Sequence, residues 1–131
     1  MKHLLISLTV AASVLHAPVY AGQDIDTPGL LINETRTFAG QEFFTAFATV
    51  WQAYDPDSRY TLVIFERPSA RSGSQITVNY LGNVIYRRFI SFNAKQAHHA
   101  GELASADAFR AVMTVELDRT AIDPDLGTDE L

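Results

Sequence analysis

The sequence predicts an α+β domain in which a helix, a three-stranded antiparallel meander and a second helix follow one another, with two helices packed on a small antiparallel sheet. Three observations predict this class. Apolar residues recur at helical spacing across 37–54, strand-like runs separated by short turns fill 59–92, and helical spacing returns at 94–120. We therefore expect a single domain over 37–120.

The first helix is predicted from the segment TFAGQEFFTAFATVWQAY. Its apolar side chains recur three or four residues apart on one face: Phe43, Phe47, Val50, Trp51 and Tyr54. Thr37 is the expected N-cap, and the DPDS that follows ends the helix. Three phenylalanines lie between 43 and 48, and Phe44 points roughly 100° away from Phe43. Core packing is the first expectation for Phe43, and either residue is a candidate for contact with a partner.

Three strands are predicted next, from RYTLVIFE, SQITVNY and VIYRRFISF. The middle run alternates cleanly, with Ile76, Val78 and Tyr80 on one face. The short connections favour an antiparallel meander covered by helices on one side. Arg87 and Arg88 point to opposite faces of the third strand, where we expect them to be solvated or to protect a sheet edge from pairing.

The second helix is predicted over 94–120 from one apolar stripe: Leu103, Ala106, Phe109, Met113 and Leu117. Before the domain, 22–36 is expected to be a flexible arm that adds a short strand around Leu30 to Ile32. After it, 121–131 is an acidic tail that we expect to be disordered.

The first 21 residues have the pattern of a secretory signal peptide. A short basic start precedes an apolar run too short to span a bilayer, and the small residue Ala21 offers the cleavage site. Cleavage after Ala17 is the less favoured alternative because Pro18 would follow it. We expect an exported mature protein that begins at Gly22 and has no membrane helix.

Composition excludes several classes of function. Without Lys2 the mature chain has nine Lys and Arg against 15 Asp and Glu, a formal net charge of −6, which argues against nucleic acid as a partner. The chain has no cysteine, and this excludes disulfides, a thiol nucleophile, a cysteine-ligated metal and a lipid-modified cysteine.

No residue pattern predicts an enzyme. His98 and His99 are adjacent, so on a helix they diverge and cannot share a metal as an i, i+4 pair could. No serine lies in a nucleophile elbow, and the carboxylate pair Asp55 and Asp57 lies in a turn where hydration keeps both groups ionised. We therefore predict no catalytic residue, no metal and no cofactor.

The segment ERPSARSGSQITV, residues 66–78, is unusually charged for a hairpin connection. Pro68 fixes one backbone angle and disfavours helix at Arg67, so the guanidinium groups are held in place. The segment is either a recognition surface or a hairpin in which Glu66 pairs with Arg67 or Arg71, a contact worth less than about 1 kcal/mol. The binding candidates here are Glu66, Arg67, Pro68, Ser69 and Arg71.

Four segments in this order carry a resemblance to a known family: PGLL, EFFTAFATVW, ERPSARSGSQITV and NVIYRRFISF. Together they resemble the CsgE family of curli production assembly/transport components, over Pro28 to about Phe92. ERPSAR followed by Gly-Ser and a strand is the most specific part. Relatives carry aromatic residues around this segment, where the present chain has Ser72 and Gln75, so Phe43 or Phe44 is the substitute we expect for an apolar anchor.

The resemblance implies a non-enzymatic periplasmic factor in the export of functional amyloid. Proteins of this family form a ring, nonameric by this resemblance, that caps the CsgG-type outer-membrane secretion channel. They recruit unfolded CsgA-type curlin subunits and restrain their premature polymerisation, without nucleotide hydrolysis, a cofactor or membrane insertion. An alternative from another class is a monomeric periplasmic holdase that binds exposed strands of several clients along its sheet edge.

Overall fold

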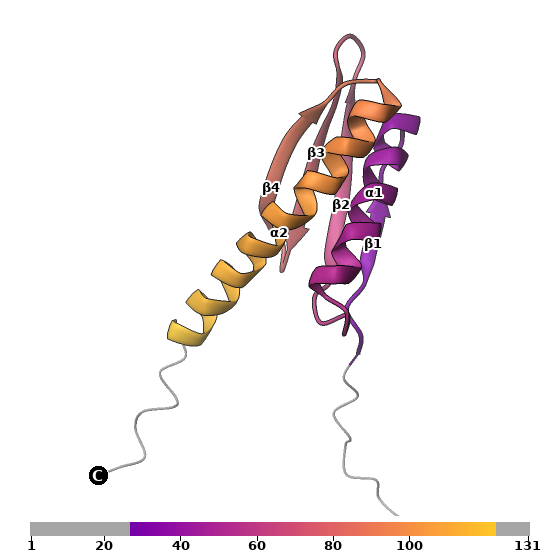
Figure 1. Ribbon diagram of the computed structural model, residues 1–131. Coiled ribbons are helices and arrows are strands. Elements are labelled where there is room, and N and C mark those ends of the chain that lie inside the picture. Colours follow the sequence, from indigo (N-terminus) through magenta and orange to yellow (C-terminus); the bar gives the residue numbers. More distant parts are fainter. Residues whose placement is uncertain (1–26, 123–131) are drawn as a thin grey trace, which may run out of the picture.

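In the computed structural model, which describes residues 27–122, two helices lie on one face of a four-stranded sheet (Figure 1). The elements in chain order are β1 (Leu31–Glu34), α1 (Phe38–Tyr54), β2 (Leu62–Ser69), β3 (Gly73–Tyr80), β4 (Asn83–Ile90) and α2 (Ala94–Ile122). The predicted α+β class is confirmed. The predicted signal peptide and the tail from residue 123 lie outside the described residues.

The sheet has the strand order β1-β2-β3-β4, with β1 parallel to β2 and the other pairs antiparallel. The predicted three-stranded antiparallel meander is confirmed as β2 to β4, and β1 extends it to a four-stranded mixed sheet. The difference comes from the predicted N-terminal arm, where the expected short strand exists as β1 and Leu31 pairs with Leu62. Because α1 forms the crossover between them, β1 and β2 run in the same direction.

The β2–β3 hairpin is longer than the sequence indicated. Strand β2 continues through Ser69, which pairs with Gly73, so only Ala70 to Ser72 form the turn. Gly73 has a φ of +113°, and a Cβ there would collide with the carbonyl oxygen of Ile90. A glycine is required where this hairpin meets the end of β4.

The core lies between α1 and the sheet, and its centre is a row of aromatic rings on α1. Phe43 stacks on Phe47 with 6.2 Å between ring centroids, and Phe47 stacks on Trp51 at 5.6 Å. The sheet contributes fully buried aliphatic side chains: Leu62, Ile64, Ile76 and Val78. Thr37 caps α1 as predicted, and its side chain accepts a 3.0 Å hydrogen bond from the Gly40 amide.

The buried face of α2 differs from the predicted stripe. Leu103 and Leu117 are 49% and 71% exposed, so neither belongs to the core. The buried positions are instead small residues that face α1, followed by one valine: Ala97, Ala100, Gly101, Ala104, Ser105, Ala108 and Val112. The Ser105 hydroxyl donates a 2.8 Å hydrogen bond to the Phe47 carbonyl oxygen. Small side chains let the two helices approach closely, which apolar periodicity alone does not reveal.

The β3–β4 turn places an apolar residue in a strained backbone conformation. Leu81 and Gly82 have φ angles of 50° and 79°, as both central residues of a type I′ hairpin turn require. Asn or Gly normally occupies the first position because a left-handed conformation costs other residues about 1 kcal/mol or more. The Leu81 side chain is also 54% exposed.

We expect Leu81→Asn to raise the free energy of unfolding by about 1 kcal/mol, because Asn tolerates the left-handed conformation and little buried apolar area is lost. Urea denaturation of the mature protein measures the change. Val84→Asn, a similarly exposed position in extended β4, is the matched control and should not stabilise. A lower stability of Leu81→Asn would mean that the side chain contributes packing that outweighs its strain.

Candidate protein-interaction surface

Glu66, one of the predicted binding residues, is fully buried beneath the N-terminus of α1. Its carboxylate accepts hydrogen bonds from the Arg36 amide at 2.6 Å, from the Thr37 amide at 2.8 Å and from the Thr37 hydroxyl. Negative charge at a helix N-terminus is favourable because the first amides have no partner within the helix. Glu66 therefore ties β2 to the start of α1 and cannot meet a partner at the surface of this chain.

The protonation of Glu66 follows from these contacts. Burial alone raises the pKa of its carboxyl, but the hydroxyls of Ser74 and Thr37 and the two backbone amides outweigh burial and hold the pKa below its usual range. Of these groups, the Ser74 hydroxyl lies close to the carboxylate without the geometry of a full hydrogen bond. The Glu66 side chain is thus a buried carboxylate, and no ion pair joins it to Arg67 or Arg71 within 27–122.

The β2 segment after Glu66 carries exposed binding candidates. Arg67 and Pro68 are exposed, and Ser69 is half-buried with its hydroxyl 3.5 Å from that of Ser72. Strand β1 pairs with β2 only as far as Phe65, so within the described part of the chain β2 has a free outer edge from Glu66 onward. Pro68 has no amide hydrogen to offer along this edge, which prevents another strand from pairing there. Side chains are therefore the groups that this edge offers to another protein.

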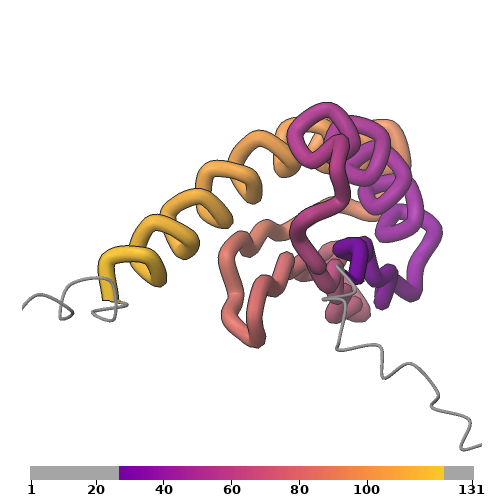
Figure 2. Tube along the Cα trace, turned by 90° about the horizontal axis from the view of Figure 1, so that it is seen from below, coloured from indigo at the N-terminus to yellow at the C-terminus, as the bar shows by residue number. Residues whose placement is uncertain are grey.

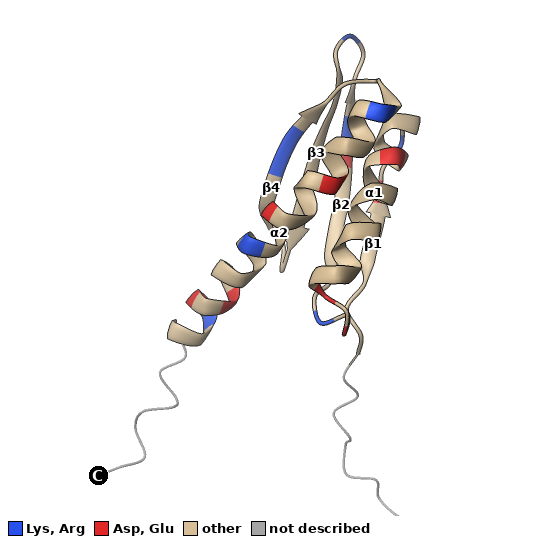
Figure 3. Cartoon of the chain, viewed as in Figure 1, with Lys and Arg blue, Asp and Glu red and all other residues tan. Residues whose placement is uncertain are grey.

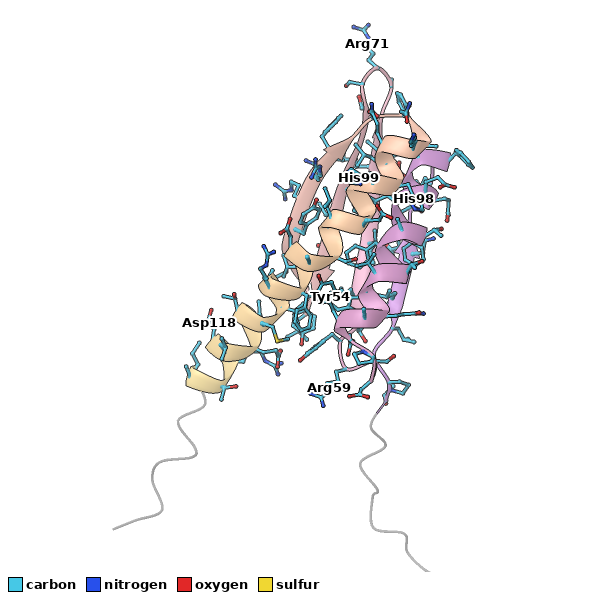
Figure 4. All side chains as sticks on the ribbon, in the orientation of Figure 1. Tyr54, Arg59, Arg71, His98, His99 and Asp118 are labelled. Carbon is cyan, nitrogen blue, oxygen red and sulfur yellow. The ribbon has the colours of Figure 1, made fainter. Side chains whose placement is uncertain are left out.

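Arg71 lies at the tip of the β2–β3 hairpin and points away from the rest of the molecule (Figure 4). The hairpin extends past the ends of both helices, and its tip carries positive charge (Figures 1 and 3). Among the described residues, neither Arg67 nor Arg71 has an ion pair. We call Arg67, Pro68, Ser69 and Arg71 the hairpin surface.

The two phenylalanines proposed as apolar anchors lie elsewhere. Phe43 is completely buried in the core, and Phe44 is half-buried and packs against the core. The aromatic side chains with large exposure are instead Phe38, Phe89 and Phe92, at 73%, 53% and 52%. The exposure of Phe38 could have been predicted from the sequence, because this residue directly follows the N-cap and lies outside the stripe of Phe43, Phe47 and Trp51.

Two polar clusters join α2 to the rest of the fold. His98 Nδ1 lies 3.3 Å from the Glu42 carboxylate of α1 and its Nε2 lies 3.7 Å from Glu102. Further along α2, the Tyr80 hydroxyl donates a 2.6 Å hydrogen bond to Glu116. Burial, together with this bond to the carboxylate, raises the pKa of Tyr80 to about 12. Both clusters are structural links, and in the part of the chain that the structure describes, no group of acidic and histidine side chains could hold a metal ion.

Residues 27–130 match the family model described as curli assembly protein CsgE. The chain belongs to the CsgE family. A relative from Salmonella typhi, described as curli production assembly/transport component CsgE, is 35% identical over 127 residues, covering 92% of this chain and 93% of the relative. CsgE relatives from Escherichia coli O6:H1 and O157:H7 are each 39% identical over 80 residues, covering 61% of this chain and 56% of the relative.

Membership of the CsgE family confirms the resemblance and makes the protein a non-enzymatic accessory component of curli assembly and transport. The match continues beyond Phe92, where the resemblance had been placed, and includes all of α2. Within 27–122, neither helix is long and apolar enough to cross a membrane.

Proposed function

We propose that this CsgE-family protein is a periplasmic adaptor that caps the CsgG-type outer-membrane channel as a homo-oligomeric ring. It is exported by a signal peptide cleaved after Ala21. Beneath the channel it recruits CsgA-type curlin subunits and restrains their polymerisation before export. The proposal is supported by the family match over 27–130 and by the similarity to a relative described as a curli production assembly/transport component.

The observation that favours an adaptor most directly is the hairpin surface. Its guanidinium groups are exposed and have no ion pair within the described residues, so they are available to carboxylates or carbonyl oxygens of another protein. Glu66 anchors the base of the hairpin to α1 by three hydrogen bonds, and Pro68 stiffens its free edge. A partner that binds there therefore meets a surface that is already ordered, which lowers the entropic cost of association.

We expect Arg71→Glu to abolish co-elution of the mature protein with the detergent-solubilised channel, because the substitution places the opposite charge at the hairpin tip. The fold should remain intact, since the side chain is exposed and unpaired. Size-exclusion chromatography of the mixture, from Gly22 onward, measures the complex. Arg59→Glu is the matched control: Arg59 is an exposed arginine at the other end of the molecule (Figure 4). Equal co-elution of wild type and Arg71→Glu would remove the hairpin tip from the interface.

The alternative holdase has a specific surface in the structure. Among residues 27–122, strand β4 pairs only with β3, so the other edge of its eight residues is open to an extended client. Arg87 and Arg88 lie on opposite faces of this edge strand, as predicted. The molar mass of the free protein separates the two functions: a ring requires a multimer larger than a dimer, whereas binding along β4 requires no self-association.

A further inference from the structure

The sheet face opposite the helices carries no covering element within 27–122 (Figure 2). Such a face of an antiparallel sheet is usually polar because water contacts it. Here Val63 and Phe65 are half-buried, and Ile32, Val84 and Phe89 are 38%, 49% and 53% exposed. We call this helix-free side the open face. Apolar side chains therefore lie on this face among polar ones such as Arg67, Gln75 and Thr77.

One row across the open face is Ile32, Val63, Asn79 and Val84, as the strand register shows. Both ends of this row are apolar. In its middle, the Asn79 side-chain oxygen is buried and has no hydrogen-bond partner among the described residues. Next to it the face is hollowed into a groove of about 520 Å³, which Leu81 and Val84 line on one side and Thr61 and Val63 on the other.

The next row is Glu34, Phe65, Thr77 and Arg87. Glu34 and Arg87 carry opposite charges at opposite edges of the sheet, and three strand spacings of about 4.8 Å keep them about 14 Å apart. They cannot pair with each other in one chain, and neither forms an ion pair with another described residue. The centre of the row, Phe65 and Thr77, has no charge.

We propose that the open face packs against the open face of a second copy of this chain, about a two-fold axis parallel to the strands. This rotation keeps each row level and reverses the order of the strands, so β1 of one copy lies over β4 of the other. Glu34 of each copy then faces Arg87 of the other copy, which gives two such pairs. In the row below, Ile32 faces Val84. In these two rows charges meet only at the rim, as in specific protein interfaces, and in the next row Arg67 of the inner strand β2 faces Gln75 of the second copy.

The same rotation fills the groove. It places the β3–β4 turn of the second copy, with its exposed Leu81, over the start of β2, where Thr61 and Val63 line the hollow. An exposed leucine in a left-handed turn thereby gains a contact that compensates for its strain. Packed sheets tolerate an angle of about 30° between their strands, so the natural twist of both sheets is compatible with this contact.

The size of the open face predicts a weak dimer. Four strands at about 4.8 Å spacing and eight residues at about 3.3 Å give a face of about 500 Å², so two faces bury about 1,000 Å². That is near the lower limit for a specific interface. The contact is isologous and closes at two copies, and it leaves Arg71 at the hairpin tip free, although Arg67, opposite Gln75, lies on the open face itself. The test of the dimer can therefore be read separately from binding to the channel through Arg71.

Cross-linking between introduced cysteines tests the proposed packing of the two open faces. Because the chain has no native cysteine, only the introduced residues can react. Mature protein with Ile32→Cys and Val84→Cys is treated with a short bismaleimide and analysed on a denaturing gel. Both positions are partly exposed, so the substitutions should leave the fold intact, as circular dichroism can verify. We expect a covalent dimer from the double variant and much less from either single variant, because like positions of the two copies lie about 14 Å apart across the sheet.

Charge reversal then tests recognition. In the double-cysteine background, Arg87→Glu should lower the yield of covalent dimer about tenfold, since each substitution sets two like-charged pairs at the interface. Adding Glu34→Arg restores opposite charges and should restore the dimer. Arg88→Glu is the matched control, because Arg88 is the adjacent arginine on the helix side of β4.

Absence of a covalent dimer, equal yields from the single variants, or equal losses from Arg87→Glu and Arg88→Glu would each overturn the face-to-face pairing. Arg87→Glu should still co-elute with the secretion channel, whereas Arg71→Glu should not. Failure of the dimer is therefore distinguishable from failure of the proposed function.

Discussion

Glu66→Ala is expected to lower the free energy of unfolding by about 3 kcal/mol or more, because it empties a fully buried site and leaves three partly buried donors without an acceptor. The donors are the Arg36 amide and the amide and hydroxyl of Thr37, all of which bond to the Glu66 carboxylate. Small domains have only about 5–15 kcal/mol in total, so the loss should be visible in a urea denaturation curve. Arg67→Ala, the neighbouring but exposed position, is the control and should change stability by less than about 0.5 kcal/mol.

The same carboxylate predicts how stability depends on pH. Its pKa is lowered in the folded protein from an ordinary value of 4.5, so the unfolded state binds the proton more readily. The contribution of Glu66 is fully present above pH 4.5 and is lost as the pH falls through the lower folded pKa. We expect Glu66→Gln to be destabilised at neutral pH and to lose less further stability on acidification than wild type. Identical pH profiles would show that the Glu66 carboxylate is not selectively stabilised in its charged form.

Glu66 also shows where sequence reasoning stops. A charged residue beside Pro68 and two arginines favours a surface loop, and nothing local contradicts that interpretation. Its true partners, Arg36 and Thr37, are 30 and 29 residues earlier in the chain. Only the placement of β2 beneath the start of α1 brings them together. The exposure of Arg67 and Arg71, by contrast, follows from local chemistry, and their role in binding stays a prediction.

The secondary structure was predictable wherever a long periodic pattern existed. The two helices and β2 to β4 carry such patterns, and the opposite faces of Arg87 and Arg88 follow from simple alternation. The pairing of β1 was not predictable, because four residues are too few to show a period and their partner lies beyond α1. The apolar stripe assigned to α2 was misleading for a different reason: the contact with α1 is made by small residues, which count little in hydrophobic periodicity.

Substitution of Gly101 tests the close contact between α1 and α2, because the expected change in stability is opposite to that of Gly→Ala in an exposed helix. In an exposed helix, Gly→Ala stabilises by about 0.5–1 kcal/mol. Here a Cβ would collide with the carbonyl oxygen of Phe43 on α1, a backbone atom that cannot turn aside. We therefore expect Gly101→Ala to destabilise, and Gly101→Val to cost about 3 kcal/mol or more, because α1 and α2 must separate.

Chemical denaturation of both Gly101 variants measures these changes, with Leu103→Ala as control on the exposed side of the same helical turn. Leu103 is 49% exposed and should contribute little, although hydrophobicity alone would rank it above Gly101. Separation of the helices would also break the hydrogen bond from Ser105 to Phe47, which adds to the cost of the larger side chain. If Gly101→Ala were stabilising and Leu103→Ala strongly destabilising, α2 would have to be rotated so that its leucine stripe, and not its small residues, faces the core.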